Sequence, residues 1–95
     1  MKPVIHPGRL LRREMNARRL NSNRLDINLG VPSGSIASIL DGRRSICADT
    51  ALRLGRCLGN GHQFWLKLQG QYDVAAAAHE IPEEENKGRF LVDAT

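Results

Sequence analysis

The chain has 95 residues and a net charge of +4, a length that suits one domain and leaves little for a second. It has no apolar run long enough to span a membrane and no signal-peptide pattern, so we expect a cytoplasmic protein with no membrane partner. Two cysteines and three scattered histidines exclude a disulfide framework and a zinc site, and both thiols are expected to be buried or half-buried.

The charge is divided unevenly along the chain. Residues 1–56 hold eleven Lys/Arg and four Asp/Glu, a net +7, whereas residues 57–95 hold three and six, a net −3. A basic surface attracts the phosphate backbone of nucleic acids by releasing counterions. The alternative is a solvated charged surface, and charge alone leaves both interpretations open.

The scarcity of aromatic residues and of period-two alternation predicts an all-α fold with five helices. The first helix is expected over residues 8–18, because Pro7 is tolerated in a first helical turn. The second is expected over residues 22–29, with Asn21 or Ser22 as its N-cap.

The third helix follows a glycine turn at Gly30. It is expected to begin at Pro32 or Ser33 and to end at Leu40. Gly34 would then lie inside the helix and cost roughly 1 kcal/mol relative to alanine.

A fourth helix is predicted over residues 48–58 and a fifth over residues 61–80. Cys47 stands at the start of the fourth helix and lacks a capping hydroxyl, a loss worth about 1 kcal/mol. The fifth helix carries nearly all of the large aromatic surface, and aromatic residues are enriched at interfaces. The predicted dimer or partner contacts are Phe64, Trp65 and Tyr72.

Two short helices joined by a tight glycine turn indicate a helix-turn-helix unit. Apolar residues occupy the positions where the two helices must cross, namely Leu25, Leu29, Val31, Ile36 and Ile39. In such a unit the second helix lies in the major groove of DNA.

Four stretches of the chain carry a resemblance to a known family. In order they are HPGRLLRREM, NLGVPSGSI, ILDGRRSICADTALRLGRCLG and FWLKLQGQYDV. Together they resemble the HigA-type antitoxins, also called virulence-associated protein I, within the Xre/Cro-like helix-turn-helix group. The resemblance extends over residues 6–74.

The resemblance implies a lambda-repressor-like domain over residues 1–80, followed by a flexible or short-strand tail over residues 81–95. It also implies a homodimeric antitoxin that binds double-stranded operator DNA and represses its own operon. The same protein would neutralise a cognate HigB-type toxin, which is a ribonuclease. No enzyme activity, metal, cofactor or small-molecule substrate is expected, because no nucleophile–base pair or glycine-rich phosphate loop is present.

The predicted DNA contacts lie at the start of the second helix, on the third helix and in the loop that follows. They are Ser22, Ser33, Gly34, Ser35, Ala37, Ser38, Arg43 and Arg44. Ser33, Ser35 and Ser38 are expected at base edges, and the two arginines at phosphates. Ser22 stands where the family often has a glutamine that contacts a phosphate.

Asp26 departs from the family pattern, which has alanine at this turn-packing position. Because a buried, unpaired carboxylate is costly, we expect Asp26 to turn outward or to pair with a nearby arginine. The third helix carries no charge before Arg43, and together with Asp26 this motivates the first of two alternatives that stay open. One is a toxin-binding module with weakened DNA binding, and the other is a stand-alone repressor without a toxin.

Overall fold

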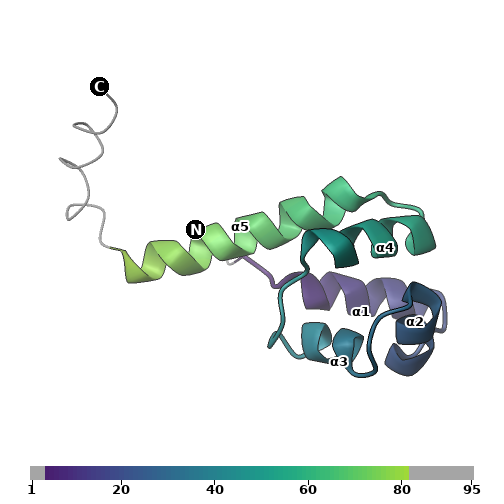
Figure 1. Ribbon diagram of the computed structural model, residues 1–95. Helices are drawn as coiled ribbons and strands as arrows, with labels where there is room; N and C mark the ends of the chain where they lie inside the picture. The colour runs from purple at the N-terminus through teal and green to yellow at the C-terminus, as the bar shows by residue number, and fades with distance from the viewer. Residues whose placement is uncertain (1–3, 82–95) are drawn as a thin grey trace.

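The computed structural model describes residues 4–81, which form five α-helices and, over that part of the chain, no strand (Figure 1). The helices are α1 (Pro7–Ala17), α2 (Ser22–Leu29), α3 (Ser35–Leu40), α4 (Ala48–Leu58) and α5 (His62–Glu80). The predicted all-α class is confirmed, with α2 and α3 as the helix-turn-helix pair. The predicted tail lies outside the described residues except for its first residue, Ile81.

α1 and α2 both begin at a capping side chain. The Nδ1 atom of His6 accepts the backbone N–H of Gly8 at 2.9 Å, at the start of α1. The Oδ1 atom of Asn21 accepts the N–H of Arg24 at 2.8 Å. Asn21 is therefore the N-cap of α2, and Ser22 is the first residue of the helix.

α3 is shorter than the sequence suggested. Gly34 is its N-cap, with a φ of +91°, a left-handed backbone conformation that glycine adopts without steric cost. The predicted start at Pro32 or Ser33 is wrong because that segment forms a turn. The expected helix penalty of Gly34 is wrong for the same reason, since the residue precedes the helix.

α4 begins after Cys47, whose thiol makes no capping hydrogen bond, as expected. Both Cys47 and Cys57 are free and exposed, so the prediction of buried thiols is wrong. The reason is their position, because Cys47 precedes the helix and Cys57 lies outside the buried stripe. That stripe consists of Thr50, Ala51, Leu54, Gly55 and Leu58.

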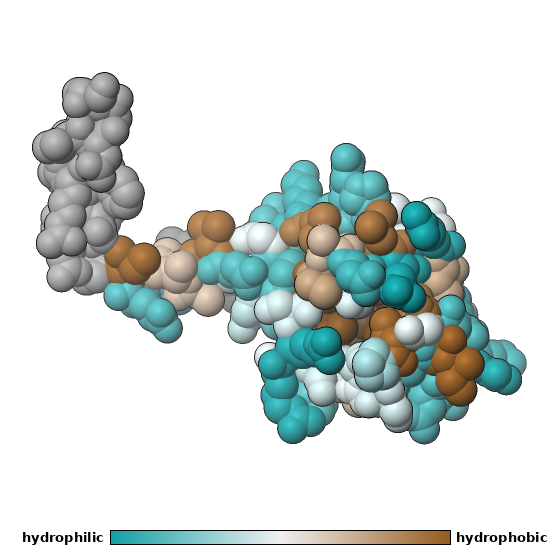
Figure 2. All heavy atoms as spheres, viewed as in Figure 1, coloured by the Kyte–Doolittle hydropathy of each residue, from teal (hydrophilic) through white to brown (hydrophobic). Residues whose placement is uncertain are grey.

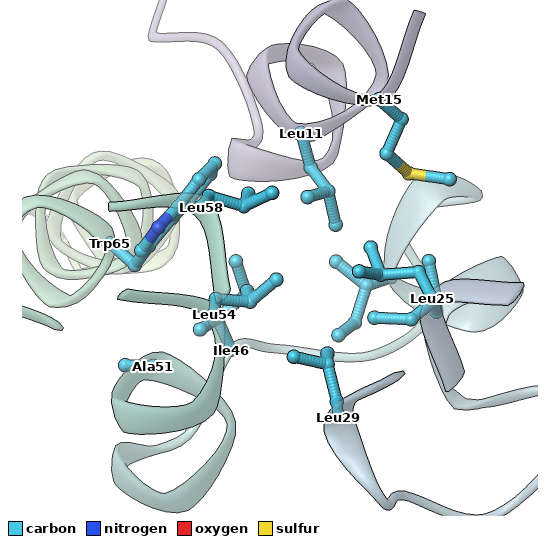
Figure 3. Packing of buried hydrophobic residues seen from close by; sticks show 11 residues of the cluster. Leu11, Met15, Leu25, Leu29, Ile46, Ala51, Leu54, Leu58 and Trp65 are labelled. Atoms are coloured by element: carbon cyan, nitrogen blue, oxygen red, sulfur yellow. The ribbon is translucent and has the colours of Figure 1, made fainter. Parts of the chain in front are cut away.

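One apolar core joins the five helices. Its members are Leu11, Met15, Leu25, Leu29, Ile36, Ile39, Ile46, Ala51, Leu54, Leu58 and Trp65. Figure 3 shows Leu11 and Met15 of α1 pointing toward the side chains of α2 and α4. Trp65 is 0 % exposed, and its Nε1 atom donates to Oδ1 of Asn60 at 2.9 Å. The prediction of Trp65 as a partner contact is therefore wrong, because the core takes up its whole ring.

The backbones of α1 and α3 touch at Gly8. A Cβ atom on Gly8 would collide with the carbonyl oxygen of Ile39, closer than real Cβ atoms approach backbone. Only glycine permits this contact, and it seats the C-terminal end of α3 against α1.

α5 packs on α4 and α1 through its first half and then projects beyond them (Figure 1). Figure 2 shows hydrophobic and small pale residues along the projecting part. Of the predicted partner residues, Phe64 is 37 % exposed, whereas the half-buried Tyr72 packs edge-on against His6 with ring centroids 4.8 Å apart. None of the described helices is both long enough and apolar enough to cross a membrane.

Candidate nucleic-acid interface

The turn between α2 and α3 is fixed from the side of α4. Gly30 ends α2 with a φ of +72°, as the sequence predicted. The Nη1 atom of Arg53 donates to the carbonyl oxygen of Leu29 at 2.7 Å, so α4 satisfies a carbonyl at the end of α2. The direction in which the chain leaves α2 is therefore tied to α4.

Asp26 caps α3 from a distance. Its Oδ2 atom accepts the N–H of Gly34 and its Oδ1 atom accepts the N–H of Ile36, both at 2.9 Å. The side chain neither turns outward nor pairs with an arginine, so both expectations for Asp26 are wrong. The residue is only 3 % exposed, and its charge is satisfied by backbone amides at the positive end of the α3 dipole.

This cap supplies what α3 lacks locally. Its N-cap residue, Gly34, has no side chain to accept an N–H, and the helix has no acidic residue in its first turn. The first amides of a helix have no intrahelical partner and are costly to bury unpaired. Asp26 on α2 therefore orients the N-terminus of α3 relative to α2.

Ser35 is not available for the contact that the sequence predicted. It is 6 % exposed, and its Oγ atom donates to the carbonyl oxygen of Pro32 at 2.6 Å. The prediction of Ser35 at a base edge is wrong because the hydroxyl closes the turn before α3. No sequence signal marks this role, since a serine at a helix start serves equally as a cap or as a contact.

The remaining predicted residues of this helix and its turn are at the surface. Ser33 and Gly34 are exposed, and Ala37 and Ser38 are half-buried. Ser22, at the start of α2, is also half-buried. The surface of α3 is thus small, polar and uncharged.

The two arginines lie in the loop that leaves α3. The N–H groups of Arg43 and Arg44 both donate to the carbonyl oxygen of Ser38, at 3.0 and 3.2 Å. The Nη2 atom of Arg43 pairs with Oδ2 of Asp41 at 2.9 Å, and both side chains are well exposed. An exposed pair of this kind contributes little, so Arg43 can exchange Asp41 for a phosphate at small cost. Within residues 4–81, Arg44 has no acidic partner.

The same loop ends at a thiol with altered acidity. The Sγ atom of Cys47 lies 3.5 Å from Oγ1 of Thr50. The Thr50 hydroxyl, and then the nearby backbone amide of Thr50, favour the thiolate and hold the pKa of the Cys47 thiol below its usual value. Within the described residues, no cluster of His, Cys, Asp and Glu is arranged to hold a metal ion.

Known proteins with similar sequences or structures include antitoxins and virulence-associated proteins. The chain is 40 % identical to virulence-associated protein I of Dichelobacter nodosus over 79 residues, which is 82 % of this chain and 73 % of the relative. It is 38 % identical to an addiction module antidote protein of the HigA family from Coxiella burnetii. That structure matches with a TM-score of 0.83, covering 90 % of this chain and 95 % of the other.

The chain belongs to the HigA family of antitoxins. The structure of the Pseudomonas aeruginosa antitoxin HigA with the higBA promoter is also similar, at 34 % identity and a TM-score of 0.77. That match covers 85 % of this chain and 98 % of the other. No protein-family model matches the sequence.

The sequence did not predict the roles of two polar residues of this HigA-family chain. The capping role of Asp26 was missed because its partners are eight and ten residues away, beyond the reach of local capping rules. A signal was present, because an acidic residue near a helix that begins without a capping side chain suggests a distant cap. Gln69 was missed as well, although it is 4 % exposed and binds the backbone N–H of Ile46.

We expect Asp26→Ala to lower the free energy of unfolding by about 1–3 kcal/mol, because it leaves the Gly34 and Ile36 amides without their acceptor. Asp26→Asn should cost less, since one acceptor oxygen remains. Chemical denaturation followed by circular dichroism measures both values. The control is Asp49→Asn, which removes an exposed pair with Arg53 and should change stability by less than about 1 kcal/mol. Equal effects of Asp26→Ala and the control would refute the capping role.

Proposed function

We propose that this chain is the antitoxin of a type II toxin–antitoxin pair. It represses its own operon by binding operator DNA as a homodimer, and it neutralises an RNA-cleaving HigB-type toxin. The observation that carries the proposal is the α2–turn–α3 unit, capped by Asp26 and followed by the exposed Arg43 and Arg44. The related Pseudomonas HigA was solved with its promoter, which supports DNA as the ligand of this unit.

Different residues of the α3 surface and the loop after it suit contact with phosphates and with bases. Arg43 and Arg44 have exposed guanidinium groups beyond the C-terminal end of α3, where they suit phosphates flanking the reading helix. Ser33 and Ser38 offer hydroxyls to base edges, and the small Ala37 lets the helix approach closely. Hydroxyls both donate and accept, so they discriminate bases less than a bidentate arginine does.

The uncharged α3 also favours a second candidate function, a toxin-binding module whose DNA binding is weak. The two candidates differ in a measurable property, which is the preference for operator over unrelated DNA. Phosphate contacts alone give affinity without preference, and base contacts add preference.

We expect the chain to bind its own promoter more tightly than a scrambled duplex at physiological salt, by fluorescence anisotropy or gel shift. Replacing both Arg43 and Arg44 by alanine should weaken binding to either duplex and lower the salt slope by about 2, because each phosphate contact contributes about one unit. Arg56→Ala on α4 removes the same kind of exposed charge and serves as the control. Equal affinity for promoter and scrambled DNA would favour the toxin-binding module.

The homodimer is proposed to form through the projecting part of α5. A shallow groove of about 590 Å³ runs along it, lined by Val4, Lys67, Gly70, Gln71, Val74, Ala75 and Ala78. Val74 is 70 % exposed and Ile81 is 53 % exposed, so nothing within residues 4–81 covers this apolar face. A dimer is what a helix-turn-helix protein needs to place two reading helices one DNA turn, about 34 Å, apart.

Val74→Glu combined with Ala78→Glu should convert the dimer to a monomer, because it places charge on the face that a second copy would cover. Sedimentation equilibrium measures the change, and the monomer mass is 10.5 kDa. Ala76→Glu introduces the same side chain on the opposite face of α5 and should leave the dimer intact. A wild-type chain that sediments as a monomer at high micromolar concentration would refute this interface.

Toxin neutralisation predicts that the chain forms a stable complex with the product of the adjacent reading frame when the two are co-expressed. Expression of that product alone should arrest growth, and co-expression of this chain should restore it. The Arg43→Ala, Arg44→Ala double variant should still restore growth, because its altered surface is assigned to DNA. Growth arrest that persists despite soluble antitoxin would contradict the antitoxin assignment while leaving DNA binding untouched.

A further inference from the structure

The loop that carries Arg43 and Arg44 is held at both ends. At its start, the N–H groups of both arginines donate to the carbonyl oxygen of Ser38. At its end, Ile46 is 2 % exposed and its N–H donates to Oε1 of Gln69 on α5 at 2.8 Å. Gln69 lies 23 residues further along the chain, so this bond ties the loop to a distant helix.

The amide of Gln69 is oriented from both sides. Its Oε1 atom faces an N–H donor, and its Nε2 atom donates to Oδ1 of Asp73 at 3.0 Å. A flipped amide would place two donors together at Ile46 and two acceptors together at Asp73. The series from Asp73 through Gln69 to Ile46 therefore has one stable arrangement.

No other side chain takes this role within residues 4–81. In the segment from Asp41 to Cys47, Ile46 is the one residue whose backbone N–H donates to a side chain of the described residues, and that side chain is Gln69. Trp65, Gln69 and Asp73 are spaced four residues apart and so share one face of α5. On this face, Trp65 is buried in the core, and the buried Gln69 binds the loop through Ile46.

A hydrophobic residue at position 69 would fill the space without holding the loop. The Ile46 N–H would then be buried without an acceptor, and the loop would open to give it water. The polar residue is thus placed where it fixes the backbone beside the two arginines.

We propose that Gln69 is a positioning residue for DNA contact, which holds the segment of Arg43 and Arg44 in register with α3 through its bond to Ile46. This rests on the proposed function, in which the two arginines contact phosphates. Asp73 supports the role by fixing the Gln69 amide. The Ile46 end of the loop is therefore held by α5, the helix that also carries the proposed dimer face.

The test exchanges the amide and the carboxylate between positions 69 and 73. Gln69→Glu keeps an acceptor for Ile46 but sets two carboxylates against each other at Asp73, so the side chain is displaced. We expect promoter affinity to fall about tenfold, which corresponds to about 1.4 kcal/mol. Asp73→Asn alone should have little effect, because its amide oxygen can still accept from Gln69.

The double variant Gln69→Glu, Asp73→Asn should restore both affinity and the loop, since the new amide at position 73 donates to the new carboxylate at position 69. Amide hydrogen exchange at Ile46, followed by NMR, should accelerate in Gln69→Glu and return to the wild-type rate in the double variant. Asn60→Ala removes the bond to Trp65 and is the stability control. It should lower the melting temperature but leave the promoter affinity of the folded protein unchanged.

The outcomes separate the inference from the proposed function. If alanine at positions 43 and 44 weakens promoter binding but Gln69→Glu does not, Gln69 is not a positioning residue and the proposed function stands. If affinity falls in Gln69→Glu and in Asn60→Ala alike, in proportion to stability, the role is merely structural and the inference fails. A wild-type chain without DNA binding would overturn the proposed function and the inference together, whatever the Ile46 exchange rate.

Discussion

The carboxylate of Asp26 is the interaction on which the candidate interface depends. α3 has six residues, too few to be stable alone, and no local side chain caps its start. Two backbone amides donate to Asp26, so the direction of α3 is set by α2 rather than by its own sequence. A buried carboxylate is tolerable here because both oxygens have donors and the helix dipole favours a negative charge.

Three further contacts fix α3 and the segments on either side of it. Arg53 holds the end of α2, the close approach at Gly8 holds the C-terminal end of α3, and Gln69 holds the loop beyond it. Each involves a backbone group, and each comes from a different helix. These contacts hold α3 and its uncharged surface in place. A small displacement of α3 would leave backbone polar groups unpaired or bring backbone atoms into collision.

The sequence predicted the parts of this fold that follow from local chemistry. The apolar spacing identified α2 and α4 with their bounds, and Gly30 marked the turn because a left-handed residue ends a helix there. It failed where the partner is distant or the residue has two equivalent uses. Asp26 finds its donors in another helix, Ser35 turns inward, and the helical spacing of Trp65 is the same for a core residue as for an interface residue.

The cap also shapes how the interface attracts phosphates. A helix N-terminus is ordinarily a place where free amides and the dipole draw an anion. In α3 the carboxylate of Asp26 already takes two of these amides, and its negative charge opposes a second anion. In the proposed complex, attraction for the DNA backbone is therefore expected from the arginines beyond the C-terminal end of α3 and from Ser22 at the start of α2. The centre of the candidate interface consists of small uncharged residues. In the proposed complex, any preference for sequence therefore has to come from close approach to the bases rather than from charge.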